Sequence, residues 1–249
     1  MLKNIILKSA NLFGYTIKKT FSDPVVDNDL EFISVYNKCK DYTITPIERM
    51  YALYNAVKFI VGSKIPGDFV ECGVFKGGSI MLVAYTLREL RETNRKIYLY
   101  DTFAGMSEPT EDDFQMSNNK SAISTWKSKQ KKDNNNWAFS PLSEVQKNMY
   151  STGYPENNII FVMGKVEETI PNTLPSNIAL LRLDTDWYES TKHELTHLFP
   201  LVSKNGILLI DDYGCFAGAK KATDEYFLDK LPMLLNRIDF TGRIGIKME

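Results

Sequence analysis

The fold is decided by one stretch, Asp68-Phe-Val-Glu-Cys-Gly-Val-Phe-Lys-Gly-Gly-Ser79. Its first five residues have the form of a short buried strand, and a helix is predicted from Gly77 to Arg91. Gly73 permits a sharp turn between the two, while Gly77 and Gly78 let the backbone approach a ligand at the start of the helix. A strand that turns directly into a helix indicates the first unit of a parallel α/β sheet.

The rest of the chain continues this alternation of strands and helices. Helices are predicted from Thr45 to about Val61, with Thr45 as N-cap and Pro46 at the first helical position, and from Glu189 to Val202. Four further strands are predicted at Ile97–Asp101, Ile159–Met163, Ile178–Asp184 and Gly206–Asp211. The fold class is therefore α/β, with a doubly wound, Rossmann-like, mostly parallel sheet. A C-terminal hairpin, Leu235–Asp239 with Arg243–Met248, adds an antiparallel edge.

Composition limits the classes of protein to consider. The chain has 249 residues, of which 43% are hydrophobic and 24% charged, and its net charge is −1. These values exclude a disordered or disulfide-dense protein and give no basic footprint for nucleic acid. Three cysteines, Cys39, Cys72 and Cys215, and the lack of a transmembrane or signal segment predict a cytoplasmic protein.

Two segments lie outside the α/β pattern of the main domain, residues 43–249. The N-terminal segment, residues 1–42, is expected to be helical or partly mobile, and its weakly amphipathic start could contact a membrane surface or a partner, or pack as a first helix. Residues 107–141 form a polar insertion whose main apolar residues are Trp126 and Trp137. Such a long insertion is either a substrate lid or a mobile loop, and the sequence leaves both open.

Two groups of residues follow the predicted strands and could carry chemistry. Glu71 precedes the glycine turn and suits a ligand with an ammonium group, and Asp101 ends the second strand, where a carboxylate can accept both hydroxyls of a ribose. Asp184, Asp186, Asp211 and Asp212 would converge at the carboxyl edge of the sheet. Crowded carboxylates repel one another unless a cation neutralises them, and oxygen ligands suit Mg²⁺ or Mn²⁺. The alternative is a set of turn and helix caps.

One further motif resembles a zinc-protease site. His193-Glu-Leu-Thr-His197 matches H-E-x-x-H, and these are the only two histidines of the chain. On a helix, Leu195, Leu198, Phe199 and Val202 would form the apolar face, which leaves both histidines on the opposite side, toward solvent. A zinc hydrolase is therefore a weak alternative.

Taken together, these stretches resemble the macrocin O-methyltransferase family of class I, S-adenosylmethionine-dependent and Mg²⁺-dependent enzymes. The resemblance runs from about Thr45 to Phe227 and rests on four stretches, Gly67–Ser79, Asp101–Gly105, Leu181–Thr191 and Gly206–Tyr213. The family methylates sugar hydroxyls of glycosylated natural products. The resemblance implies a cytoplasmic homo-oligomer, as a dimer, whose partner molecule is a sugar-containing acceptor or glycan.

The resemblance also implies roles for individual residues. Glu71, Gly73, Gly77 and Ser79 would border the methionine part of the cofactor, Asp101 would hold its ribose, and Gly164 would lie near its adenine. Asp184, Asp211 and Asp212 would be the metal ligands.

The expected mechanism combines both sources. With strand order 3-2-1-4-5, the cofactor lies over strands 1 and 2 and the metal over strands 4 and 5. A sugar hydroxyl bound to Mg²⁺ would then give its proton to Asp186 as general base. The alternative from another class is a nonenzymatic cofactor-binding or interaction protein on the same fold.

Overall fold

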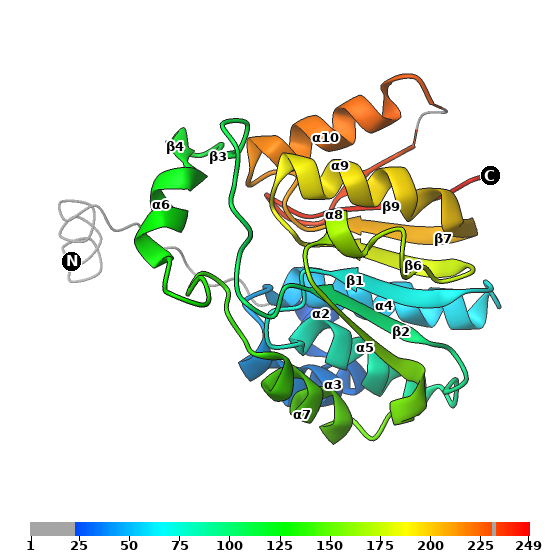
Figure 1. Cartoon of the computed structure of the whole chain (residues 1–249). Coiled ribbons are helices and arrows are strands. Elements are labelled where there is room, and N and C mark those ends of the chain that lie inside the picture. Colours follow the sequence, from blue (N-terminus) through cyan, green and yellow to red (C-terminus); the bar gives the residue numbers. More distant parts are fainter. Residues whose placement is uncertain (1–22, 231–232) are drawn as a thin grey trace, which may run out of the picture.

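The computed structural model describes residues 23–230 and 233–249, and its main sheet has seven strands. Figure 1 shows this sheet between two layers of helices. The strand order is β5-β2-β1-β6-β7-β9-β8. The first five strands are parallel, and β9 runs antiparallel to both β7 and β8. In that order the strands span Ile159–Met163, Ile97–Asp101, Asp68–Cys72, Ile178–Leu183, Val202–Ile210, Arg243–Ile246 and Asn236–Arg237. The predicted doubly wound sheet and its antiparallel C-terminal edge are confirmed.

Helices cover both faces of the sheet (Figure 1). One layer contains α3 (Leu30–Cys39), α4 (Ile47–Gly62), α5 (Gly78–Glu89) and α7 (Leu142–Ser151). The other contains α8 (Val166–Thr169), α9 (Tyr188–His197) and α10 (Ala217–Leu228). The remaining short elements are α2 (Pro24–Asp27), η1 (Lys40–Tyr42), η2 (Glu156–Asn158) and η3 (Phe199–Leu201).

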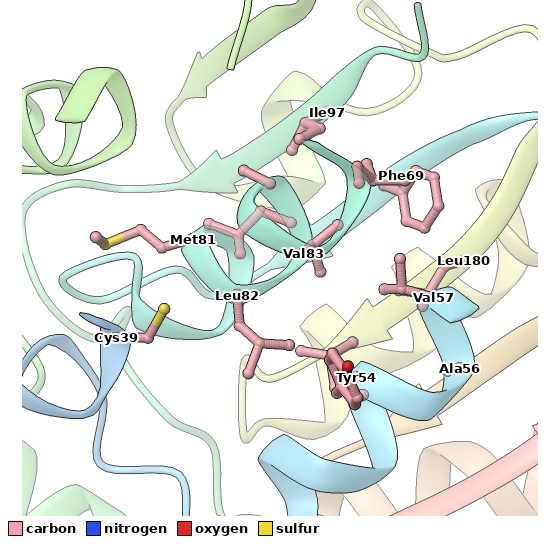
Figure 2. Close-up of a cluster of buried hydrophobic side chains, with 14 of the residues drawn as sticks. Cys39, Tyr54, Ala56, Val57, Phe69, Met81, Leu82, Val83, Ile97 and Leu180 are labelled. Carbon is pink, nitrogen blue, oxygen red and sulfur yellow. The ribbon is translucent and has the colours of Figure 1, made fainter. Parts of the chain in front are cut away.

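Alternation along each strand divides the core into two clusters. Phe69 and Leu180 face α4 and α5, where they pack with Val57 and Leu82 (Figure 2). The intervening residues, such as Val70, point to the opposite face and join the cluster that includes Leu195 and Leu198. Since both faces of the parallel strands are covered, the strands carry continuous apolar runs rather than an alternating pattern.

Two predicted helix boundaries are wrong. Pro46, not Thr45, is the N-cap of α4, because the Thr45 hydroxyl instead accepts a hydrogen bond from Arg182 Nη2 at 3.1 Å. The helix from Tyr188 ends at His197, not at Val202, and Val202 already begins β7. Pro200 explains the early end, since proline cannot donate the next helical hydrogen bond and disfavours helical geometry at the residue before it.

The segments that broke the α/β pattern are folded where the structure describes them. The insertion contains β3 (Phe114–Gln115), β4 (Lys120–Ser121) and α6 (Ala122–Lys129), and it leaves the sheet just after β2. Helices α2 and α3 and the turn η1 occupy residues 24–42, whereas the amphipathic start of the chain lies outside the described residues. Within the described ranges, no helix has the length and apolar character needed to cross a membrane.

Strand register aligns the functional positions at one edge. Cys72 of β1 pairs with Leu183 of β6, and Leu183 pairs with Ile210 of β7. The ladder extends one residue further, because Asp184 N donates to Cys72 O at 2.8 Å and Asp211 N donates to Leu183 O at 2.9 Å. The residues that directly follow these three strands are therefore neighbours at the carboxyl edge of the sheet.

Candidate active site

A single pocket of about 270 Å³ opens at the carboxyl edge and joins the two groups of residues singled out in the sequence. Its wall includes Gly73, Ser79, Asp101 and Gly164 on the side of β1, β2 and β5. The same wall includes the four aspartates that follow β6 and β7, Asp184, Asp186, Asp211 and Asp212. Glu71 and Gly77 do not line it.

The glycine turn, residues 73–78, is shaped by close backbone approach. Gly73 has φ +82°, and a Cβ placed there would lie 1.9 Å from the backbone oxygen of Asp184. Gly73 therefore joins the turn to the start of the aspartate loop, a role that the sequence did not reveal. At Gly78 a Cβ would lie 2.7 Å from Thr43 Cβ and from the backbone carbon of Tyr42. Gly78 was expected to let the backbone approach a ligand. In the structure it instead lies against the segment that precedes α4.

Asp101 organises the side of the pocket that β1 and β2 form. Its Oδ2 accepts hydrogen bonds from the backbone N–H groups of Val74 at 2.7 Å and Phe75 at 3.2 Å. Its Oδ1 accepts one from the backbone N–H of Phe103 at 2.7 Å. Burial raises the pKa of Asp101, and the three backbone donors oppose that shift. The carboxylate therefore holds the glycine turn in place and also faces the pocket.

Glu71 lies behind this wall and is 1% exposed. Its Oε1 accepts hydrogen bonds from Ser79 Oγ and from Arg182 Nη1, whereas its Oε2 is buried without a hydrogen-bond partner. Burial raises the pKa of Glu71, and the charge of Arg182 lowers it. In this structure Glu71 acts on the pocket through Ser79 and Arg182.

Three carboxyl groups meet on the other side of the pocket. Oxygen atoms of Asp184, Asp186 and Asp212, called here the acidic cluster, lie within 4.8 Å of one another. Asp186 has φ +67°, a left-handed conformation that non-glycine residues rarely adopt and that directs the loop after β6. Asp212 Oδ2 is buried and has no hydrogen-bond partner.

Asp211 is held apart from this cluster by two arginines. Arg182 Nη2 lies 2.5 Å from Asp211 Oδ1, and Arg49 Nη1 contacts Asp211 Oδ2. Arg182 is 3% exposed and also pairs with Glu71 at 2.5 Å and Asp184 at 2.8 Å. Asp186 therefore occupies the place in the carboxylate group at which Asp211 was expected. Neither arginine was predicted from the sequence. Arg182 could have been singled out, because it is a charged residue inside the apolar run Ile178–Leu183.

The electrostatics of the acidic cluster are unfavourable without a cation. Burial raises the pKa of Asp186 to about 7, and the charges of Asp184 and Asp211 add to the shift. Burial also raises the pKa values of Asp184 and Asp212 well above the usual range; the charge of Arg182 opposes this shift at Asp184, and neighbouring carboxylates add to it at both. Closely spaced carboxylates that share protons or a cation are typical of functional sites.

The insertion packs against the same loops through one buried aspartate. Asp113 Oδ1 accepts a hydrogen bond from Tyr188 N, in the first turn of α9, at 2.8 Å, and Asp113 Oδ2 accepts one from Thr110 N at 2.7 Å. Gly218 in α10 leaves room for this contact, because a Cβ there would lie 1.9 Å from Asp113 Oδ1. Asp113 is 0% exposed and was not predicted, since Tyr188 and Gly218, against which it packs, are far away in sequence.

The H-E-x-x-H motif lies on α9, away from this pocket. His193 Nε2 is 2.8 Å from the backbone oxygen of Ile170, and the two histidine rings lie 4.3 Å apart, half-buried rather than facing solvent. Between them, Glu194 is fully buried and accepts a hydrogen bond from Thr185 Oγ1 at 3.0 Å. Within residues 23–230 and 233–249, the only group of three or more potential metal ligands is the acidic cluster.

The fold and this pocket define the class of protein. A parallel sheet with this strand order, a glycine turn after β1 and a carboxylate at the end of β2 form the architecture of class I S-adenosylmethionine-dependent methyltransferases. The sequence model of the macrocin-O-methyltransferase (TylF) family matches residues 20–244, and the chain belongs to that family of O-methyltransferases.

Curated relatives and solved structures agree with this assignment. The chain is 32% identical over 185 residues to demethyldecarbamoylnovobiocin O-methyltransferase of Streptomyces niveus, with 74% of this chain and 67% of the relative covered. It is 28% identical to mycinamicin III 3''-O-methyltransferase of Micromonospora griseorubida, with 74% and 70% covered. The structure of the O-methyltransferase NovP superposes with a TM-score of 0.73 at 28% identity, covering 84% of this chain and 83% of that one.

Proposed function

We propose that this enzyme transfers the methyl group of S-adenosylmethionine to a hydroxyl of a sugar in a glycosylated small molecule, with a divalent cation, Mg²⁺ or Mn²⁺, held by the acidic cluster. The observation that carries the proposal is the shared pocket. Its wall combines Gly73, Asp101 and Gly164 with Asp184, Asp186 and Asp212, so a cofactor and an acceptor can meet in one cavity.

The acidic cluster fits a hard divalent cation. Three carboxyl groups within 4.8 Å supply oxygen ligands, and the buried Asp212 Oδ2 lacks any other partner. Mg²⁺ is commonly bound by a small number of carboxylates and keeps positions for water or substrate oxygens. Both carboxylate oxygens of Asp211 are paired with arginines, whereas Asp184 shares only Arg182 and no ion pair of the described residues involves Asp186, so Asp211 would be a poorer ligand than Asp186.

The residues that would bind the cofactor lie on the opposite side of the pocket. The carboxylate of Asp101 would accept hydrogen bonds from the ribose hydroxyls, beside the glycine turn that it holds in place. Gly164, with φ +139°, would leave space for the adenine. Ser79 and Gly73 border the region nearest β1, which suits the methionine part. When bound, the cofactor supplies an electrophilic methyl group and the cation stabilises negative charge on the acceptor oxygen.

The expected role of Asp186 as general base would change in this arrangement. As a cation ligand, Asp186 would carry a negative charge that the cation neutralises, so the proton of the acceptor hydroxyl would pass to water. Holding the two reacting groups in one pocket supplies much of the remaining acceleration.

Substrate class follows from the relatives. The relatives at 28–32% identity are named for methylation of demethyldecarbamoylnovobiocin, a rhamnosyl tetracenomycin and mycinamicin III. We therefore expect a glycosylated natural product or glycan as acceptor and a homodimer as the assembly. The insertion, residues 107–141, would form the lid over that acceptor, since its residues Ser107, Trp137 and Ala138 line the pocket.

The test is methyl transfer from isotope-labelled S-adenosylmethionine to a panel of glycosides, with and without EDTA. The proposal predicts transfer to a sugar hydroxyl that EDTA abolishes and that added Mg²⁺ restores. Equal transfer in EDTA would disprove the role of the cation. Failure of calorimetry to detect S-adenosylmethionine binding would disprove the cofactor site.

A further inference from the structure

One tryptophan of the insertion faces the same pocket as the acidic cluster. Trp137 lines the pocket next to Met106 and Phe216. It is only half-buried, whereas its neighbours Trp187 and Phe216 are 2% and 5% exposed. Part of the Trp137 ring is therefore available to a ligand, and the other two rings support it from behind.

The position of this ring is built into the protein. Trp137 N donates to Asn135 Oδ1 at 2.9 Å, and Trp137 O accepts from Met106 N at 3.1 Å. The ring meets Trp187 edge to face, with centroids 5.5 Å apart at 74°, and meets Phe216 at 6.4 Å and 57°. A ring fixed in this way before binding loses little conformational entropy when a ligand arrives.

The indole N–H of Trp137 differs from those of the other two tryptophans. Trp126 Nε1 donates to Met106 O at 2.8 Å, and Trp187 Nε1 donates to Ser107 O at 3.0 Å. Trp137 Nε1 has no such acceptor among the hydrogen bonds of the described residues, and Trp137 is the one of the three tryptophans that lines the pocket. Since a tryptophan in a binding site normally pairs its N–H, this donor is available to a ligand hydroxyl.

We propose that Trp137 is the platform on which the sugar ring of the acceptor stacks, an inference that rests on the proposed function. The C–H face of a pyranose is apolar and fits a flat indole, while the hydroxyls at its rim can accept from Trp137 Nε1. Trp187 directly follows Asp186, and Phe216 lies four residues after Asp212. The residues that support the platform thus belong to the loops of the acidic cluster, which would fix the sugar ring relative to that cluster.

This arrangement makes Trp137 a residue that determines the sugar specificity of the enzyme. Ring stacking needs one face free of axial hydroxyl groups, so the stereochemistry of the sugar would decide binding more than its aglycone. Trp137 is a positioning residue, because it would contact the acceptor ring and not the atoms that exchange the methyl group.

The experiment uses two matched substitutions at one position. Trp137→Phe keeps an aromatic face without the N–H, and Trp137→Leu keeps apolar bulk without the face. Phe114→Leu is the control, an exposed aromatic residue of the same insertion that does not line the pocket. Each full-length variant is first checked by thermal unfolding. Binding of S-adenosylhomocysteine is measured by calorimetry, and binding of methyl α-L-rhamnopyranoside and methyl β-D-glucopyranoside by saturation-transfer NMR with irradiation of aromatic protons.

The platform predicts transfer of saturation to the C–H protons of one sugar face in the wild type. We expect Trp137→Leu to weaken glycoside binding about tenfold and Trp137→Phe about threefold, with the control unchanged. Binding of S-adenosylhomocysteine should stay within about twofold in all variants. The KM for the acceptor should rise accordingly, with little change in the KM for S-adenosylmethionine.

The outcomes separate this inference from the proposed function. If the wild type fails to bind S-adenosylhomocysteine, the proposed function falls and the platform falls with it. If it binds the cofactor product but neither glycoside receives saturation from aromatic protons, the platform alone is wrong. Equal loss of glycoside and cofactor affinity in Trp137→Leu would place the ring at the cofactor and would also overturn the inference, as would equal glycoside affinity in the Phe and Leu variants.

Discussion

The two sides of the pocket are built in opposite ways. On the cofactor side, the carboxylate of Asp101 accepts three backbone hydrogen bonds and Gly73 fits closely against the neighbouring strand end. On the acceptor side, Asp184, Asp186 and Asp212 crowd together, and Asp212 Oδ2 has no partner. The Asp101 carboxylate is therefore satisfied by backbone donors, whereas in the acidic cluster Arg182 pairs with Asp184 alone and leaves Asp186 and Asp212 without a cationic partner among the described residues. Unfavourable local energetics of this kind mark functional sites.

The largest loss of stability is expected at Gly73, where the glycine turn meets the loop of the acidic cluster. Gly73→Val would place a side chain on a residue with φ +82° and within 1.9 Å of the Asp184 backbone. We expect a loss of unfolding free energy of more than about 4 kcal/mol, enough to prevent folding as well as cofactor binding. Urea unfolding measures the loss.

Gly62→Ala is the matched control, because nothing lies within 4 Å of a Cβ at Gly62. Its unfolding free energy should change by less than about 1 kcal/mol. Normal stability of the Gly73→Val variant would mean that the close contact between the glycine turn and the aspartate loop is wrong.

The second-largest change in stability is expected at Asp211, which should respond to substitution differently from the adjacent Asp212. Asp211→Asn removes the charge that Arg49 and Arg182 share and leaves a half-buried and a buried guanidinium group with fewer partners. We expect a loss of about 3 kcal/mol of unfolding free energy. Thermal and urea unfolding of the metal-free protein would measure it, and an unchanged stability would contradict the structural role given to Asp211.

Asp212→Asn should act in the opposite direction. Removing one carboxylate from the acidic cluster relieves repulsion, so the metal-free protein should gain about 1 kcal/mol. The same variant should lose the stabilisation by Mg²⁺, which for the wild type would reach about 2.7 kcal/mol at a hundred times the Kd. A variant that is less stable and still responds to Mg²⁺ would argue against the assignment of Asp212.

The smallest effect concerns pH. Folding raises the pKa values of Asp184, Asp186 and Asp212, that of Asp186 to about 7. The folded protein therefore binds more protons than the unfolded chain, and the stability of the metal-free protein should fall as pH rises from about 5 to about 8. Urea unfolding across this range should show the fall, and saturating Mg²⁺ should reduce it. A metal-free protein that gains stability over the same range would contradict the raised pKa values.

Sequence alone predicted much of the fold, because the informative signals were local. Asp68–Cys72 and the other parallel strands are short apolar runs, and the glycines after β1 require a turn. Helix ends were less predictable: Thr45 has the side chain of an N-cap, but the buried Arg182 takes its hydroxyl as a hydrogen-bond partner instead. A tertiary contact thus replaced a local one.

For the site, the sequence predicted only that residues at the ends of several strands would lie close together. The order of strands brings Gly73, Asp184 and Asp211 to one edge, and this could be anticipated from the α/β pattern. Which aspartates converge could not, because that depends on Arg49 from α4 and on the left-handed backbone of Asp186. Neither feature can be predicted from the spacing of residues. Both affect which of the four aspartates has a structural role and which could bind a cation.

The central claim is that Asp184, Asp186 and Asp212 bind a divalent cation beside the cofactor. The most direct test is a crystal structure of the protein grown with S-adenosylhomocysteine and Mn²⁺, with anomalous scattering measured to locate the metal. The account predicts one strong anomalous peak at coordination distance from oxygens of these three residues, with Asp211 still paired to Arg49 and Arg182. An ordered cofactor product with no peak there, or with a peak ligated by Asp211 in place of Asp186, would contradict it.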